Sequence, residues 1–244
     1  MLRRDANSKE VKNLNSFYNK LDSKLILICG RCYVEKNMDQ IFNEILQGYS
    51  LFRKKYAVGD NAVMRDLSNS GQRPQIMVVS CCDSRVDPAL ILQCNPGDLF
   101  VVRNVANIVP PFQKDEALHG TSAALEFGIC LLNIKHLILL GHSQCGGIDA
   151  LLNSQNITQN DFITKWVSSI KIPDTKIKNP DEYAKLALSR SYENCMTFPW
   201  IREKIETQAL TIYRWFFDIK TGQIFTYLEN NIYQALDVKQ DAIN

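Results

Sequence analysis

The sequence has little excess charge and lacks a long apolar segment. Its 28 Lys and Arg residues nearly balance 26 Asp and Glu residues, which leaves a formal net charge of +2. This balance argues against a general nucleic-acid-binding protein and against a protein held at a membrane surface by charge. The longest apolar runs, such as residues 25–29 and 137–140, are far shorter than the roughly 20 residues of a membrane-spanning helix. We therefore expect no nucleic-acid partner and no membrane segment.

Low-complexity tracts and internal repeats are also lacking, and we expect no secretory signal, because the first residues are polar and no long apolar run follows them. Hydrophobic residues make up 45% of the 244-residue chain and charged residues 22%, as in ordinary globular proteins. Because a chain of this length can bury its own core, its eight cysteines need not form disulfides. We expect them to be buried apolar side chains, metal ligands or redox groups in a reducing compartment, and we expect the cytoplasm as the location.

The composition changes near residue 38. Residues 1–37 are mostly polar, and we interpret them as an N-terminal extension, either a flexible arm or sequence upstream of a true start at Met38. Residues 38–244 are expected to form a single domain. From Ile41 to Phe52, apolar residues recur at steps of three and four, which predicts an amphipathic helix over Asp39–Lys55.

The centre of the chain alternates predicted strands with predicted helices. Short apolar runs indicate strands at residues 75–80, 99–102 and 137–140, and helical spacing indicates a helix at 121–133. Fully apolar strands that alternate with helices favour parallel pairing with both sheet faces covered. We therefore predict an α/β fold with a central, mostly parallel β-sheet flanked by helices. Near the C-terminus, two strand-like runs flank a turn at 218–222, which predicts a hairpin at a sheet edge.

Two of the predicted strands run into residues that can bind metals. Cys81 follows the first strand, and His142 and Cys145 follow the strand at 137–140. Sites in open α/β sheets form beyond the carboxyl ends of the strands, and a spacing of three lets His142 and Cys145 reach one ion from a single turn. Two thiolates and one imidazole suit Zn²⁺ and leave a fourth position open for catalysis. We predict one zinc ion held by these three residues.

The alternative for any cysteine is a simple packing role, because free cysteines are among the most buried residues. We expect that role for Cys94, Cys130 and Cys195, each of which stands alone in an apolar context. Of the adjacent pair, we favour Cys81 over Cys82 as the ligand. Side chains at i and i+2 of an extended strand share a face, so Cys81 would point with the polar residues that follow it and Cys82 away.

The segments Cys81-x-Asp83-x-Arg85 and His142-x-x-Cys145 resemble the paired signatures of the β-class carbonic anhydrases. The similarity continues through residues 100–107, 121–128, 141–147 and 197–200, and it covers the chain from about residue 38 to its C-terminal strands. The resemblance implies a zinc enzyme that hydrates CO₂ reversibly to bicarbonate and a proton, with a zinc-bound hydroxide as the nucleophile.

The resemblance also implies roles for residues around the metal. Arg85 would hold Asp83 away from the metal, and the Asp83 carboxylate would accept a hydrogen bond from the hydroxide. Further residues match the family's substrate pocket: Gln72, a hydrogen-bond donor across a dimer interface; Phe100 and Val105, an apolar wall for CO₂; Phe127, where plant-type members commonly have tyrosine; and Gly146, a backbone donor to a bound anion.

The family has two branches, and the other branch carries a tryptophan three residues before the first cysteine ligand. Because that position here is Val78, the resemblance favours the plant-like type. The family resemblance also implies a homodimer or higher homo-oligomer. Two alternatives remain open at this point. One is a catalytically silent zinc-binding homologue of the same fold, and the other is a related zinc hydrolase that acts on CS₂-like substrates.

Overall fold

The computed structural model describes residues 32–59, 62–115, 117–153, 162–170, 172, 176–230 and 232–237. The chain divides into two compact units, residues 1–62 and 63–244. Residues 1–31 of the expected N-terminal extension lie outside the described residues. Whether this part is a flexible arm therefore stays a prediction. Within the described ranges, no helix is both long enough and apolar enough to cross a membrane.

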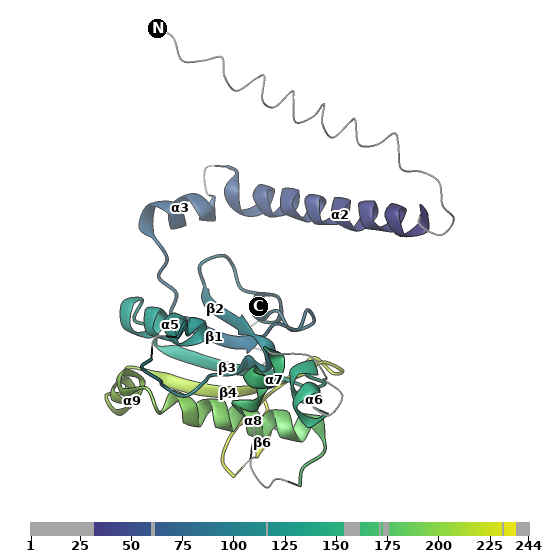
Figure 1. Cartoon of the computed structure of the whole chain (residues 1–244). Coiled ribbons are helices and arrows are strands. Elements are labelled where there is room, and N and C mark those ends of the chain that lie inside the picture. Colours follow the sequence, from purple (N-terminus) through teal and green to yellow (C-terminus); the bar gives the residue numbers. More distant parts are fainter. Residues whose placement is uncertain are drawn as a thin grey trace. The chain divides into compact units, whose positions relative to one another are not determined.

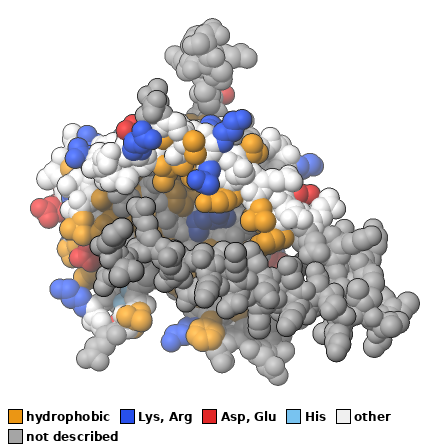
Figure 2. Space-filling view, turned by 90° about the horizontal axis from the view of Figure 1, so that it is seen from above, with side chains coloured by type: hydrophobic (Ala, Val, Ile, Leu, Met, Phe, Trp, Pro, Cys, Tyr) orange, Lys and Arg blue, Asp and Glu red, His pale blue; other side chains and the backbone are white. Residues whose placement is uncertain are grey.

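The described part of the first unit is mainly helix α2, Cys32–Phe52, which continues into a π-helical turn, Arg53–Ala57. The predicted amphipathic helix is confirmed, but it begins at Cys32 rather than Asp39. Apolar periodicity marks the part of a helix that carries an apolar stripe, and the steps of four and three continue back from Ile41 through Met38 to Val34. The additional turns therefore lie within reach of the pattern, and the prediction ended it too early. Ile41 and Tyr49 of this helix are more than half exposed. Figure 2 shows, without assigning them to one element, hydrophobic side chains among Lys and Arg side chains on one face of the molecule.

The second unit contains a six-stranded sheet with the order β2-β1-β3-β4-β5-β6. Its first four strands are parallel, and the last two are antiparallel to their neighbours. In chain order the strands are β1 (Ile76–Cys81), β2 (Leu99–Asn104), β3 (His136–His142), β4 (Thr211–Asp218), β5 (Gln223–Tyr227) and β6 (Tyr233–Ala235). The prediction of an α/β fold with a mostly parallel sheet is confirmed.

The predicted C-terminal hairpin forms between β4 and β5, but it does not end the sheet. β4 also pairs with β3, and the edge position belongs to β6. A strand of three residues is too short to produce a recognisable alternation of apolar and polar residues, so this edge strand could not be predicted from the sequence.

Helices and helical turns connect the strands and cover the sheet (Figure 1). Helix α8 packs against β3 and β4, and the helix predicted at 121–133 forms as α5 followed by a π-helical turn. The helical elements of this unit are α3 (Val63–Ser70), α4 (Pro88–Ile91), η2 (Val105–Asn107), α5 (Gly120–Glu126), η3 (Phe127–Leu131), α6 (Gly146–Leu152), α7 (Ile163–Ser168), α8 (Pro180–Cys195) and α9 (Pro199–Glu206).

The strand β1 shows how the core positions the site. Met77, Val79 and Cys81 belong to the larger buried cluster, whereas Val78 belongs to a smaller cluster with side chains of β3. Because successive side chains of a strand point to opposite faces, Cys81 lies on the same face as the main core. Parallel strands end at the same edge, and Cys81 and His142 are the last residues of β1 and β3.

Candidate metal centre

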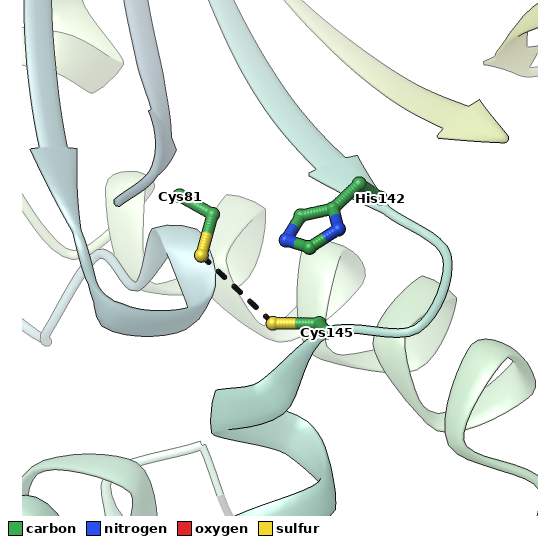
Figure 3. A group of neighbouring side chains, drawn as sticks. All are labelled: Cys81, His142 and Cys145. Atoms are coloured by element: carbon green, nitrogen blue, oxygen red, sulfur yellow. Dashed lines mark hydrogen bonds between the residues drawn. The ribbon is translucent and has the colours of Figure 1, made fainter. Parts of the chain in front are cut away.

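Three buried side chains converge where β1, β3 and α6 meet. Cys81 ends β1, His142 ends β3, and Cys145 is the residue that caps the start of α6. Their ligand atoms lie within 4.8 Å of one another, and the two Sγ atoms are 3.9 Å apart. Figure 3 shows the three side chains pointing toward one another from separate elements. Cys82, by contrast, is exposed.

The donor set fits a tetrahedral zinc ion. Two thiolate sulfurs, each about 2.3 Å from one tetrahedral zinc, would lie about 3.8 Å apart, and the observed Sγ separation is 3.9 Å. The Nδ1 atom of His142 lies 2.8 Å from the carbonyl oxygen of Ser143, so Nδ1–H donates there and the lone pair is on Nε2. This Nε2 atom is buried without a hydrogen-bond partner among the described residues. A buried acceptor without a partner is costly, and a metal ion would supply one.

The two thiols also have the electrostatics of a cation site. A hydrogen bond from Cys145 lowers the pKa of Cys81 by more than burial raises it, and the backbone N–H groups of Asp83 and Ala106 lower it further. The same contact, together with burial, raises the pKa of Cys145. The first thiolate is therefore favoured and a second one beside it is disfavoured. A bound divalent cation reverses this preference, because its charge stabilises both thiolates.

Asp83 and Arg85 form a tight ion pair in the loop after β1. The Oδ1 atom of Asp83 accepts hydrogen bonds from the backbone N–H and the Nε–H of Arg85 at 3.0 and 2.9 Å, and Oδ2 accepts from Nη2 at 2.7 Å. These bonds hold the pKa of the Asp83 carboxyl well below its usual range and raise the pKa of Arg85. The Asp83 carboxylate is thus ionised, and Arg85 engages both of its oxygens.

A second arginine holds this loop from the neighbouring strand. Arg103 of β2 donates from Nε to the carbonyl oxygen of Cys81 at 2.9 Å and from Nη2 to that of Asp83 at 2.8 Å. Its Nη1 atom donates to Asp87 at 2.7 Å, and Asp87 also caps α4. Sequence reasoning noticed Arg103 only as part of a similar segment, because nothing in its spacing indicates that it binds two carbonyl groups of the metal loop.

Two acidic residues far along the chain hold the loop between His142 and Cys145. The Ser143 hydroxyl donates to Asp218, at the end of β4, at 3.1 Å. The backbone N–H of Gln144 donates to Oδ1 of Asp181, on α8, at 2.7 Å. Sequence reasoning missed both acidic residues, since they lie 75 and 37 residues after their partners and no local pattern links them.

The residues predicted to form the substrate pocket fall into two groups. Val105 directly follows β2 and Gly146 directly follows Cys145, so both lie at the edge that carries the ligands. Phe100, near the start of β2, stacks on Phe127 with ring centroids 5.8 Å apart, and the exposed Gln72 precedes β1. A strand of five or six residues spans roughly 16 Å, so this second group does not reach the ligands of its own chain.

Comparison with known sequences places both ligand loops in one family. A sequence model described as carbonic anhydrase matches residues 76–224. The chain is 32% identical over 189 residues to β carbonic anhydrase 5, chloroplastic, of Arabidopsis thaliana, a match that covers 73% of this chain and 62% of the plant protein. It is 31% identical over 196 residues to a carbonic anhydrase of Synechocystis sp., which covers 75% of this chain and 70% of that protein.

Solved structures show the same similarity. The β-carbonic anhydrase CcaA aligns with a TM-score of 0.72 and 28% identity, over 82% of this chain and 94% of CcaA. A tetrameric β-carbonic anhydrase of Sordaria macrospora aligns with a TM-score of 0.59 and 29% identity, over 79% of this chain and 96% of that one. The chain thus spans nearly all of these solved relatives but less than two thirds of the plant protein's length.

Proposed function

Because this chain belongs to the β-carbonic anhydrase family, we propose that it catalyses the zinc-dependent, reversible hydration of CO₂ to bicarbonate and a proton. The observation that carries the proposal is the convergence of Cys81, His142 and Cys145. These residues would hold one Zn²⁺ ion per chain beside the ionised Asp83. When bound, zinc supplies a Lewis acid that makes a water molecule nucleophilic near neutral pH.

Asp83 and Arg85 act on the attacking water in this proposal. The ionised Asp83 carboxylate accepts a hydrogen bond from the water and fixes the direction of its lone pair. Arg85 restrains Asp83, since a carboxylate released beside the metal would itself be a competent ligand. At the same edge, Val105 forms part of an apolar wall for CO₂, and the Gly146 N–H donates to the bicarbonate anion as it forms.

We further propose that a second copy of the chain completes each site. Gln72, Phe100 and Phe127 lie far from the ligands of their own chain, so the predicted pocket needs these residues from a neighbour. A homodimer or higher homo-oligomer would supply them, as the assembly named for the Sordaria relatives also suggests. The exposed apolar residues of α2, such as Ile41 and Ile45, would pack on that neighbour.

Two finer assignments belong to the same proposal. Val78 is buried in the smaller cluster, where the second branch of the family carries tryptophan, and we assign the chain to the plant-like type. We propose the cytoplasm as its location. The name of the Arabidopsis relative places that protein in the chloroplast, and fractionation of cells that express the full chain distinguishes the two compartments.

The proposed activity is tested by stopped-flow CO₂ hydration together with zinc analysis of the same samples. We expect wild type to carry one zinc per chain and to accelerate hydration. Asp83→Asn should keep the zinc but lower kcat by about 100-fold, the scale of a lost proton-handling group. The exposed Asp66 on α3 provides a matched control, since Asp66→Asn makes the same chemical change away from the metal edge.

Other outcomes of this experiment would support a different function for the chain. A wild-type chain that holds zinc and leaves the CO₂ hydration rate unchanged is the silent zinc-binding homologue. A chain that hydrolyses CS₂ but does not hydrate CO₂ is the related hydrolase. A freshly purified chain without zinc contradicts the metal centre itself.

Mixing of variants tests the second copy. Asp83→Asn and Gln72→Ala each damage a different half of a shared site, so hybrid oligomers contain one site with both halves intact. Mixed and re-equilibrated variants should therefore regain activity that neither has alone. Asp83→Asn mixed with Arg85→Ala is the control without recovery, because both changes fall on the same half. If the two mixtures recover the same CO₂ hydration activity, each chain builds its site alone.

A further inference from the structure

Gln144 lies in the loop after β3 and has an unusual backbone conformation. Its φ is +55°, in the left-handed region that a residue with a side chain adopts only when its surroundings hold it there. The residue lies between two proposed ligands, His142 and Cys145. Its conformation therefore bears directly on how the second loop meets the first.

Both backbone polar groups of Gln144 are engaged. On one side, its backbone N–H donates to Oδ1 of Asp181 at 2.7 Å. On the other side, its carbonyl oxygen accepts from Nη2 of Arg85 at 3.2 Å, and its side-chain Oε1 accepts a longer bond from Nη1 at 3.4 Å. A chain of contacts thus runs from α8 through Gln144 to the arginine that binds Asp83.

Helix α8 does not need the Asp181 carboxylate to cap its own first turn. Asn179 caps that turn, because its side-chain oxygen accepts from the backbone N–H groups of Asp181 and Glu182 at 2.9 and 3.2 Å. The Asp181 carboxylate instead reaches across to the loop. Its hydrogen bond to Gln144 is a charge-assisted bond, which is shorter and stronger than a neutral one.

We propose that Asp181 is a positioning residue for Arg85. By binding the Gln144 N–H, Asp181 keeps this residue in the left-handed conformation. The backbone oxygen and the Oε1 atom of Gln144 then face the guanidinium of Arg85. Arg85 is nearly half exposed. Its contacts with Gln144 hold one edge of the guanidinium, through Nη1 and Nη2, while the edge with Nε and Nη2 binds Asp83. The inference rests on the proposed function for its catalytic consequence, although the positioning itself does not depend on catalysis.

The first experiment measures positioning without reference to activity. Hydrogen exchange of the Gln144 amide and of the Arg85 Nε–H is followed by NMR in the zinc-loaded full chain. Asp181→Ala should speed both exchanges at least tenfold. Glu182→Ala is the matched control, since it removes an acidic side chain from the same helical turn and should leave both rates unchanged. Unchanged exchange of the Arg85 Nε–H in Asp181→Ala overturns the inference, whatever the activity of the chain.

The second experiment measures the catalytic consequence. Asp181→Ala should lower kcat for CO₂ hydration about tenfold, the scale of a modest misplacement of reacting groups, with KM and zinc content unchanged. Asp181→Asn keeps an oxygen acceptor and should remain within about twofold of wild type. In an Arg85→Ala background, Asp181→Ala should have no additional effect, because the residue through which it acts is gone. An equal tenfold loss in both backgrounds would contradict action through Arg85.

Discussion

The two loops that carry the proposed ligands are held in place by different means. The loop after β1 is fixed mainly by one residue of the adjacent strand, Arg103, whose guanidinium binds two of the loop's carbonyl groups. The loop after β3 is fixed by several smaller contacts from the distant elements β4 and α8, through Ser143 and Gln144. Beside the backbone hydrogen bond from Cys82 to Asn104 at 3.0 Å, the first loop thus takes its support from β2 through one charged side chain, whereas the second loop is supported by a distributed set of contacts.

The two loops should differ in how much stability is lost when one of their supports is removed. Removal of Arg103 takes away three hydrogen bonds in one step, those to the carbonyl oxygens of Cys81 and Asp83 and to Oδ2 of Asp87, so the cost is concentrated. Removal of any one contact to the second loop leaves the others in place. Substitutions in the first loop's support should thus be more damaging than substitutions in the second loop's support.

Arg103→Met should have the largest effect on stability. The substitution keeps much of the side-chain volume but removes the hydrogen bonds to Cys81, Asp83 and Asp87. We expect a loss of roughly 3 kcal/mol in the free energy of unfolding, since several charge-assisted bonds are lost together. Denaturant unfolding and zinc analysis measure the outcome.

The matched control for this change is Arg190→Met. Arg190 pairs with Glu193 on the exposed surface of α8, and such pairs contribute little, about 0 to 1 kcal/mol. Similar losses in the two variants would mean that Arg103 acts as an ordinary surface charge and that the first loop is not held by one residue.

The same comparison explains what could be predicted from the sequence. The strands β1 and β3 were predictable because each is a short, fully apolar run that ends in polar residues. Their parallel pairing then placed Cys81 and His142 at one edge, so the metal group followed from local patterns and a general rule of sheet topology. The match to the paired motifs added Asp83 and Arg85.

The supports of the loops were not predictable in this way. Asp181 and Asp218 contact the second loop only because the chain folds back over a long separation, and a single acidic residue on a helix or after a strand carries no local signal. The positive φ of Gln144 was equally hidden, since glutamine does not favour that region. The start of α2 at Cys32 was missed although Val34 and Met38 extend the apolar spacing of the helix, because the predicted polar extension was given the residues up to 37.

Gly147→Ala should give the next largest effect, on the side of the second loop. A Cβ at Gly147 would meet Val105 Cγ1 at 2.7 Å and the Cβ of Ala106 at 3.0 Å, which forces the start of α6 away from η2. We expect a loss of about 2 kcal/mol in unfolding free energy, as for other overpacked sites. Gly146→Ala is the control next door, because its Cβ meets nothing within 4 Å. Equal stability of the two variants would mean that the α6–η2 contact is not tight.

Ser143→Ala should have a smaller effect. The buried hydroxyl donates to Asp218 and accepts from the backbone N–H of Ile219 at 2.9 Å, and the loss of both bonds should cost about 1 to 2 kcal/mol. Because Gln144 remains bound to Asp181, the zinc content should stay near one per chain. Ser168→Ala, at an exposed position on α7, is the control with little change. Loss of zinc in Ser143→Ala would show that the supports of the second loop do not back one another up.

The smallest effect concerns the charge of Asp218, the carboxylate that receives the Ser143 hydroxyl. Hydrogen bonds from Thr221, from the Lys220 backbone and from Ser143 lower the pKa of Asp218. A carboxyl whose pKa is lower in the folded state adds stability above its unfolded pKa, about 3.9, and loses that contribution as the pH falls through the folded value. The stability gap between wild type and Asp218→Asn should therefore be widest near pH 7 and should narrow below about pH 4. A gap that stays constant from neutral to acidic pH would show that the hydrogen-bond geometry of Asp218, and not its charge, supports the second loop.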